Sequence, residues 1–163
     1  MSIIIFSRPV RSGKTTELMQ YCQEITNTKV VRGILMPDLD GSRKLFDINA
    51  KEWFDIECKD PSTTRRSLIT VGAFHFYADA FEKANAIILQ AASKSDLLII
   101  DEVGKLELEQ KGFYPCIKEI LEKEEYKSPV KSLLLVVRDN LYEQVVQFFD
   151  IGQHTLINNL SDI

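Results

Sequence analysis

Ser12-Gly13-Lys14-Thr15-Thr16 follows closely on the apolar run Ile3-Ile4-Ile5-Phe6. A buried strand that turns through Gly-Lys-Thr into a helix is the phosphate-binding loop (P-loop, or Walker A motif) of nucleotide-binding proteins. Backbone N–H groups surround the phosphate oxygens, the Lys neutralises charge on the outer phosphates, and the hydroxyl ligates Mg²⁺. Apolar residues then recur at helical spacing, at Leu18, Tyr21 or Cys22, and Ile25. The stretch therefore predicts a site for a nucleoside triphosphate with Mg²⁺.

The expected phosphate loop departs from the usual pattern at its first position. G-x-x-x-x-G-K-[ST] is the common form, and Arg8 stands here at the first glycine. Lys14 is expected to meet the outer phosphates, and Thr15 is expected to hold the metal. A surface turn of small and basic residues is the alternative, which the position between a strand and a helix disfavours. The predicted nucleotide-binding residues are Arg8, Pro9, Val10, Arg11, Ser12, Gly13, Lys14, Thr15 and Thr16.

A second run, Asp96-Leu97-Leu98-Ile99-Ile100-Asp101-Glu102, ends in two carboxylates. A buried parallel strand delivers such acids to the carboxyl edge of a sheet, where ligands bind. In P-loop enzymes an Asp at this edge holds Mg²⁺, and an adjacent Glu can polarise the attacking water. Asp101 and Glu102 fit these two roles, although a core strand capped by solvated acids is the alternative.

Length and composition favour one soluble, globular domain spanning residues 1–163. Apolar residues make up 45% of the chain and charged residues 27%, as in globular proteins. The acidic balance, 20 basic against 24 acidic side chains for a net charge of −4, argues against a nucleic-acid partner bound through its phosphates.

The chain has no segment typical of membrane insertion or secretion. Its apolar runs are far shorter than the roughly 20 residues that span a bilayer, so we expect no membrane association and a cytoplasmic location. Cys22, Cys58 and Cys116 are odd in number and widely spaced. Reduced core thiols are therefore expected rather than a zinc site or disulfides.

Strands and helices alternate along most of the sequence, with one interruption. Strands are predicted at 3–6, 29–36, 96–100, 132–137 and 155–157, and helices at 15–25, 79–94, from 112 onwards and at 141–149. Between them, alternating apolar and polar residues at 44–49, 52–58, 68–72 and 74–77 predict an antiparallel β-meander inserted at about 37–78. The prediction is an α/β fold with a mostly parallel sheet and helices on both faces.

The run Asp101-Glu102-Val103-Gly104-Lys105-Leu106-Glu107-Leu108 resembles the signature of the small nucleoside-triphosphatases called cancer-related or thermophilic NTPases. That signature reads Asp-Glu-Ile-Gly-Lys-Met-Glu-Leu, so two positions differ. The phosphate loop, Arg32-Gly33, Val71-Gly72, Phe81 and Phe113 also follow the family's order. The resemblance spans nearly the whole chain.

This resemblance implies a RecA-like P-loop fold that hydrolyses ATP or GTP, and often other nucleoside triphosphates, with Mg²⁺. It implies phosphate and metal roles for Lys14 and Thr15, and metal and water-activating roles for Asp101 and Glu102. Two departures stand out. Arg8 and Arg11 occupy glycine positions of the family loop, where Gly-only backbone angles would be strained. The family's C-terminal Asn-Arg is replaced by Asn158-Asn159-Leu160.

The sequence thus predicts a Mg²⁺-dependent nucleoside-triphosphatase in which Glu102, Lys14 and Arg138 are catalytic and Thr15 and Asp101 hold the metal. Arg138 follows a predicted strand and could contact the γ-phosphate, with a solvated strand-end Arg as the equal alternative. Arg65 and Arg66, in a polar loop, are favoured as solvent-exposed rather than as a lid. Two other functions stay open. One is a nucleotide or small-molecule kinase, and the other is a nucleotide-binding switch with little turnover.

Overall fold

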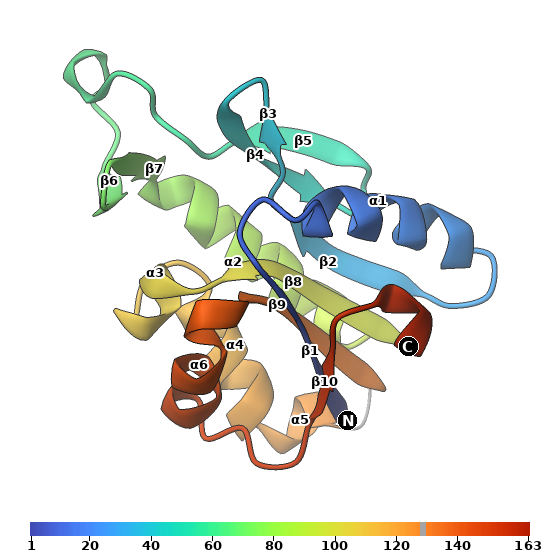
Figure 1. The fold of residues 1–163 in the computed structure, drawn as a ribbon. Coiled ribbons are helices and arrows are strands. Elements are labelled where there is room, and N and C mark those ends of the chain that lie inside the picture. Colours follow the sequence, from blue (N-terminus) through green and yellow to red (C-terminus); the bar gives the residue numbers. More distant parts are fainter. Residues whose placement is uncertain (128–129) are drawn as a thin grey trace.

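The computed structural model describes residues 1–127 and 130–163 and contains a central sheet with helices on both sides (Figure 1). The strands are β1 (Ser2–Arg8), β2 (Val31–Leu35), β3 (Asp38–Leu39), β4 (Ser42–Asp47), β5 (Glu52–Asp55), β6 (Leu68–Val71), β7 (Phe74–Tyr77), β8 (Leu97–Val103), β9 (Ser132–Arg138) and β10 (Thr155–Ile157). The α-helices are α1 (Lys14–Ile25), α2 (Ala78–Ala92), α3 (Lys105–Leu108), α4 (Tyr114–Glu122), α5 (Glu124–Lys127) and α6 (Tyr142–Phe148). Short 3₁₀ turns are η1 (Pro61–Thr63), η2 (Asp139–Leu141) and η3 (Leu160–Asp162).

The main sheet has a parallel part and an antiparallel extension. Strands β10, β1, β9, β8 and β2 lie side by side in that order, and each pairs in parallel with its neighbour. Strand β4 then pairs antiparallel with β2, and β3 and β5 both pair with β4. Strand β9 therefore lies between β1, which precedes the predicted phosphate loop, and β8, which carries Asp101 and Glu102 near its end. All three strand ends meet at one edge of the sheet.

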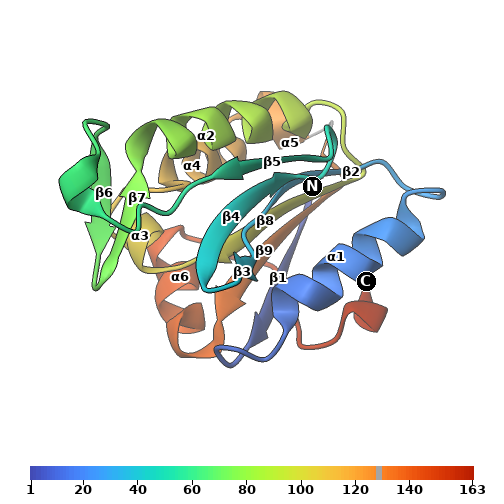
Figure 2. The same ribbon diagram turned by 90° about the horizontal axis from the view of Figure 1, so that it is seen from above.

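Alternating side chains of the buried strands fill two separate cores. On β8, Ile99 packs toward α1 with Leu18 and Cys22, whereas Ile100 packs toward α2 and α4 with residues such as Ile88 and Ile117. Successive side chains of a strand point to opposite faces of the sheet, so a strand that is apolar at consecutive positions contributes to both cores. Figure 2 shows α1 on one side of the sheet and α2 and α4 on the other. The predicted mostly parallel sheet with helices on both faces is confirmed.

The antiparallel insertion is divided into two pieces, which differs from the predicted continuous meander. Strands β4 and β5 extend the main sheet, but β6 and β7 form a separate hairpin. One isolated bridge, Glu57 to Phe76, connects the hairpin to the segment that follows β5. Instead of continuing the sheet, the hairpin packs through aromatic rings: Phe76 contacts Phe81 of α2, and Phe81 contacts Phe113. Aromatic contacts to α2 thus take the place of a full strand ladder.

Gly33 allows β2 to approach β8 closely beside the site. Its φ of 121° lies in a region that favours glycine, and a Cβ there would stand 2.0 Å from the carbonyl oxygen of Ile99. The close approach brings the end of β2 to the end of β8, where Met36 meets Asp101.

Cys22, Cys58 and Cys116 are free and buried, as predicted for core thiols. None of the helices within 1–127 and 130–163 combines the length and apolar character that crossing a lipid bilayer requires. The assignment of residues 1–163 to one domain stays a prediction.

Candidate active site

The predicted phosphate loop connects β1 to α1 at the carboxyl edge of the sheet. Helix α1 begins at Lys14, and Gly13 precedes it in the left-handed conformation, with φ 81°. The N–H groups of a helix's first turn have no partner within the helix, so they and the helix dipole form an anion site. Pro9, Val10, Arg11, Ser12 and Thr16 are exposed around this turn. The loop therefore presents the start of α1 at an exposed turn, and phosphate binding there stays a prediction.

Lys14 folds back over the loop. Its ammonium donates to the carbonyl oxygens of Arg8 at 3.0 Å and of Pro9 at 2.9 Å, and the residue is only 7% exposed. Burial lowers the pKa of Lys14 below its usual range, while the nearby carboxylates of Glu102 and Asp101 act in the opposite direction. The charge is thus held at the centre of the loop, close to both acids.

Asp101 and Thr15 meet across the sheet edge. The Thr15 hydroxyl donates to Oδ2 of Asp101 at 2.9 Å, and the Met36 N–H donates to the same oxygen at 3.0 Å. Asp101 is fully buried, and this burial, with a smaller effect from Glu102, raises the pKa of its carboxyl to about 6. A hydroxyl and a carboxylate side by side are oxygen ligands of the kind that Mg²⁺ prefers.

A bulge in β8 turns Glu102 away from Asp101. The register with β9 shifts between Ile100 and Val103, and Glu102 adopts φ 58°, in the left-handed region. Bulges re-aim side chains and are common beside active sites. As a result Asp101 faces Thr15, whereas Oε2 of Glu102 meets Arg138 at 3.1 Å and Arg43 at 3.3 Å.

The side chain of Arg8 is engaged in an ion pair at the start of the predicted loop. Its guanidinium forms an ion pair with Glu17 of α1 and lies 4.7 Å from the centroid of the Phe6 ring. Its Nε atom is buried without a hydrogen-bond partner among the described residues. The backbone of Arg8 is extended, because Arg8 is the last residue of β1. Arg11, in contrast, has a left-handed backbone conformation with φ 60°. Contact of Arg8 with phosphate stays a prediction.

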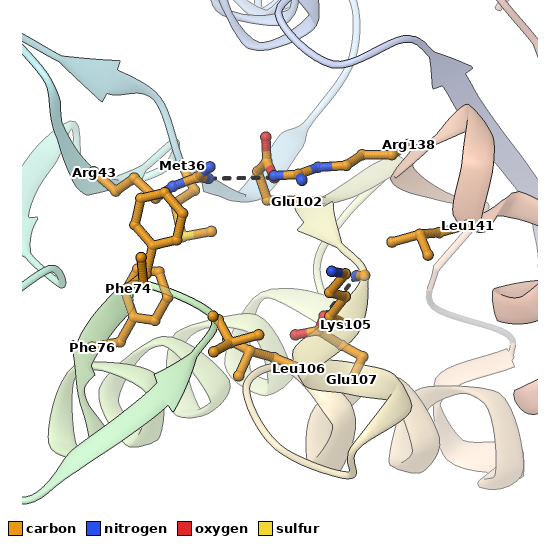
Figure 3. Close-up of a pocket in the computed structure, with 14 residues that line it drawn as sticks. Met36, Arg43, Phe74, Phe76, Glu102, Lys105, Leu106, Glu107, Arg138 and Leu141 are labelled. Atoms are coloured by element: carbon orange, nitrogen blue, oxygen red, sulfur yellow. Dashed lines mark hydrogen bonds and ion pairs between the residues drawn. The ribbon is translucent and has the colours of Figure 1, made fainter.

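A pocket opens beside Glu102, on the side of the β6–β7 hairpin (Figure 3). Its cavity volume is about 170 Å³, and Arg43, Glu102 and Arg138 lie in a row along one wall. The other walls are largely apolar and come from Met36, Val71, Phe74, Phe76, Leu106 and Leu141. The pocket is smaller than the roughly 300–1,000 Å³ of sites for larger ligands.

Two residues near the site were missed by the sequence interpretation. Arg43 comes from the insertion, and no local pattern marks it. Glu107 is fully buried in α3, where its carboxylate accepts from the N–H groups of Gly104 at 2.7 Å and Phe113 at 2.9 Å. Its place in the Asp-Glu-Val-Gly-Lys-Leu-Glu-Leu run was the available signal.

The arginines of the polar loop are not at the phosphate loop. Arg66 pairs with Asp79 through two hydrogen bonds, of 3.0 and 2.5 Å, and lies 3.6 Å from the centroid of the Tyr77 ring. Arg65 is exposed. Arg66 thus ties this loop to the start of α2.

Comparison with known protein families identifies the family of this chain. The sequence model of a family described as NTPase matches residues 3–158. The chain belongs to this NTPase family. A protein of Methanosarcina barkeri named nucleoside-triphosphatase THEP1 is 35% identical over 83 residues, which are 51% of this chain and 44% of that protein. A protein of the same name from Methanopyrus kandleri is 26% identical over 127 residues, 72% of this chain and 65% of that protein. These matches thus span less than two thirds of either relative.

Solved structures show the same fold as this NTPase-family chain. The crystal structure of THEP1 from the hyperthermophile Aquifex aeolicus superposes with a TM-score of 0.68 at 22% identity, covering 96% of this chain and 88% of that one. The solution structure of a human cancer-related nucleoside triphosphatase gives a TM-score of 0.66 at 18% identity, covering 97% and 88%. The predicted P-loop NTPase fold is confirmed.

Proposed function

We propose that this protein is a Mg²⁺-dependent nucleoside-triphosphatase that converts ATP, GTP and other nucleoside triphosphates to the diphosphate and phosphate. The observation that best supports the proposal is the contact between the predicted phosphate loop and the end of β8, where the Thr15 hydroxyl donates to Asp101 at 2.9 Å. Asp101 and Glu102 also act electrostatically on Lys14 of the same loop. Membership of the NTPase family and the names of its relatives agree with it.

Each residue would have a separate task in the reaction. Lys14 would leave the carbonyls of Arg8 and Pro9 to neutralise charge on the outer phosphates, and Arg138 would approach the γ-phosphate. Glu102 would orient a water molecule and accept its proton as the water oxygen bonds to the γ-phosphorus and the bond to the leaving diphosphate breaks. Such positioning and charge stabilisation account for most of phosphoryl-transfer catalysis.

The metal would be held by the Thr15 hydroxyl and Asp101. Their 2.9 Å contact provides oxygen donors beside the first turn of α1, a donor set that fits Mg²⁺. Bound there, Mg²⁺ would neutralise charge on the β- and γ-phosphate oxygens.

A second candidate is phosphoryl transfer to a small acceptor. The specific observation in its favour is the largely apolar pocket that has Glu102 in one wall. An acceptor hydroxyl there could replace water. This candidate would be favoured if adding an acceptor lowers phosphate release and produces the phosphorylated acceptor.

The test of the primary proposal is phosphate release from ATP, GTP, CTP and UTP with and without Mg²⁺. Glu102→Gln should retain nucleotide binding but lose turnover by roughly 10² or more, because the amide keeps the shape and removes the proton acceptor. Circular dichroism controls for unfolding. Bound nucleotide without turnover in the wild type would instead support the switch.

A further inference from the structure

Arg43 is held in place from three directions at the wall of the pocket. Its guanidinium meets Oε2 of Glu102 at 3.3 Å and lies 5.3 Å from the centroid of the Phe74 ring. Its backbone N–H donates to the carboxylate of Glu57 at 2.7 Å. The Arg43 side chain is 16% exposed, so these contacts determine where its charge lies. Arg43 therefore connects the insertion to the predicted catalytic acid (Figure 3).

The two arginines beside Glu102 share one of its oxygens. Arg43 and Arg138 both contact Oε2, and within the described residues no hydrogen bond or ion pair involves Oε1. A carboxylate that is anchored through one oxygen can direct the other at a water molecule. The anchoring matters because Glu102 is on a bulge rather than on regular strand.

The two arginines face different neighbours. Arg138 ends β9 opposite Arg8 of β1, and its charge contributes to lowering the pKa of Lys14. Arg138 is therefore on the phosphate-loop side, where an incoming γ-phosphate would attract it. Arg43 comes from β4 on the opposite side and is stacked against Phe74 of β7. A phosphate that draws Arg138 away would leave Arg43 as the remaining arginine in contact with Glu102.

We propose that Arg43 is a positioning residue for hydrolysis. It holds Oε2 of Glu102 after Arg138 has turned to the γ-phosphate, so that Oε1 keeps its direction toward the attacking water. This inference rests on the proposed nucleoside-triphosphatase function and assigns part of the active site to the antiparallel insertion.

The test compares the wild type, Arg43→Ala, Arg43→Lys, Glu102→Gln and the Arg43→Ala/Glu102→Gln double variant. Arg43→Ala should lower kcat for Mg²⁺-dependent phosphate release by roughly 10- to 100-fold, the effect of misplacing a catalytic group. KM and the Kd of a non-hydrolysable triphosphate should change by less than about twofold, because the contact acts on the reaction rather than on binding. Arg43→Lys should recover part of kcat, and Arg43→Ala should not slow Glu102→Gln further.

Lys44→Ala is the matched control. Lys44 is the next residue of β4, points to the other face, and pairs with the exposed Asp55 at 2.5 Å. Its removal should leave kcat unchanged. An unchanged kcat in Arg43→Ala, or an equal slowing by Arg43→Ala in the wild-type and Glu102→Gln backgrounds, would overturn the inference.

A urea-unfolding cycle over the same variants separates this inference from the proposed function. If Arg43 holds Glu102, the double variant should shift the urea midpoint of unfolding by less than the sum of the shifts caused by Arg43→Ala and Glu102→Gln alone. Additive shifts would refute the contact, whatever the turnover. Absence of phosphate release by the wild type, with all nucleotides tested, would refute the proposed function instead.

Discussion

Arg8 and Arg11 stand at positions of the predicted phosphate loop where the family resemblance implied glycine, and the structure separates their consequences. Arg8 is extended at the end of β1, and its guanidinium is paired with Glu17 and covers Phe6. Arg11 instead has φ 60°, which glycine adopts more readily than a residue with a Cβ. Backbone strain is therefore expected at Arg11 and not at Arg8.

Arg11→Gly should stabilise the protein. A non-glycine residue in an unfavourable backbone region costs about 1–3 kcal/mol, and the added freedom of glycine in the unfolded chain offsets about 0.4–1 kcal/mol of that gain. The expected net gain of about 1 kcal/mol is measurable by urea unfolding. Arg8→Gly is the contrast, because it removes an ion pair and ring contact without relieving strain, and it should destabilise. Destabilisation by both changes would show that Arg11 is not strained.

At the scale of the elements, strand β8 shows what local sequence can predict. Its apolar run predicts a buried parallel strand, and the two acids at its end predict chemistry at the sheet edge. The bulge that turns Glu102 from Asp101 could not be predicted, because it depends on pairing with β9. Arg43 was missed for a similar reason: its contact with Glu102 exists only once β4 is placed against β2. Sequence periodicity describes one element at a time, whereas both features belong to pairs of elements.

The short helix α3 contains a buried carboxylate, Glu107, that should make the stability of the protein depend on pH. Both oxygens of Glu107 accept backbone N–H groups, and burial raises the pKa of its carboxyl to about 7. The native state therefore binds this proton more tightly than the unfolded chain does, whose Glu pKa is about 4.3. The stabilisation that Glu107 contributes to folding is greatest below the unfolded-state pKa of about 4.3 and is lost as the pH rises through the native pKa of about 7.

Glu107→Gln should remove this pH dependence. The free energy of unfolding of the wild type minus that of the variant should decline as the pH rises from about 4.3 to 7. At the acidic end the variant should be less stable by about 1–3 kcal/mol, because the amide can accept only one of the two buried N–H groups. Urea unfolding of both proteins over pH 4.5–8 measures this difference in the free energy of unfolding. The effects of titratable groups that both proteins share cancel in the difference. A constant difference across this range would show that folding does not raise the pKa of Glu107.

For the whole molecule, the site joins segments that are distant in sequence. The loop after β1, the bulge of β8, the end of β9 and strand β4 all meet at the carboxyl edge of the sheet (Figure 1). Strand and helix order was predictable because apolar runs and helical spacing are local, and the order then restricts a parallel sheet to few topologies. The split of the insertion was not predictable, because the hairpin's partners, Phe81 and Phe113, lie outside it.

Binding of a nucleotide at this edge should stabilise the molecule as a whole. A non-hydrolysable ATP or GTP analogue with Mg²⁺ at 100 times its Kd should raise the unfolding free energy by about 2.7 kcal/mol, if it binds only the native state. Lys14→Ala should remove most of this gain, because the replaced ammonium is the charge expected to meet the outer phosphates. Glu102→Gln is the matched control and should retain the gain, since its side chain is expected to act on water rather than on binding. Thermal or urea unfolding of the three proteins, with and without ligand, measures these differences. Equal stabilisation of the wild type and Lys14→Ala would show that the nucleotide binds away from the loop between β1 and α1, and loss of the gain in Glu102→Gln would make Glu102 a binding residue.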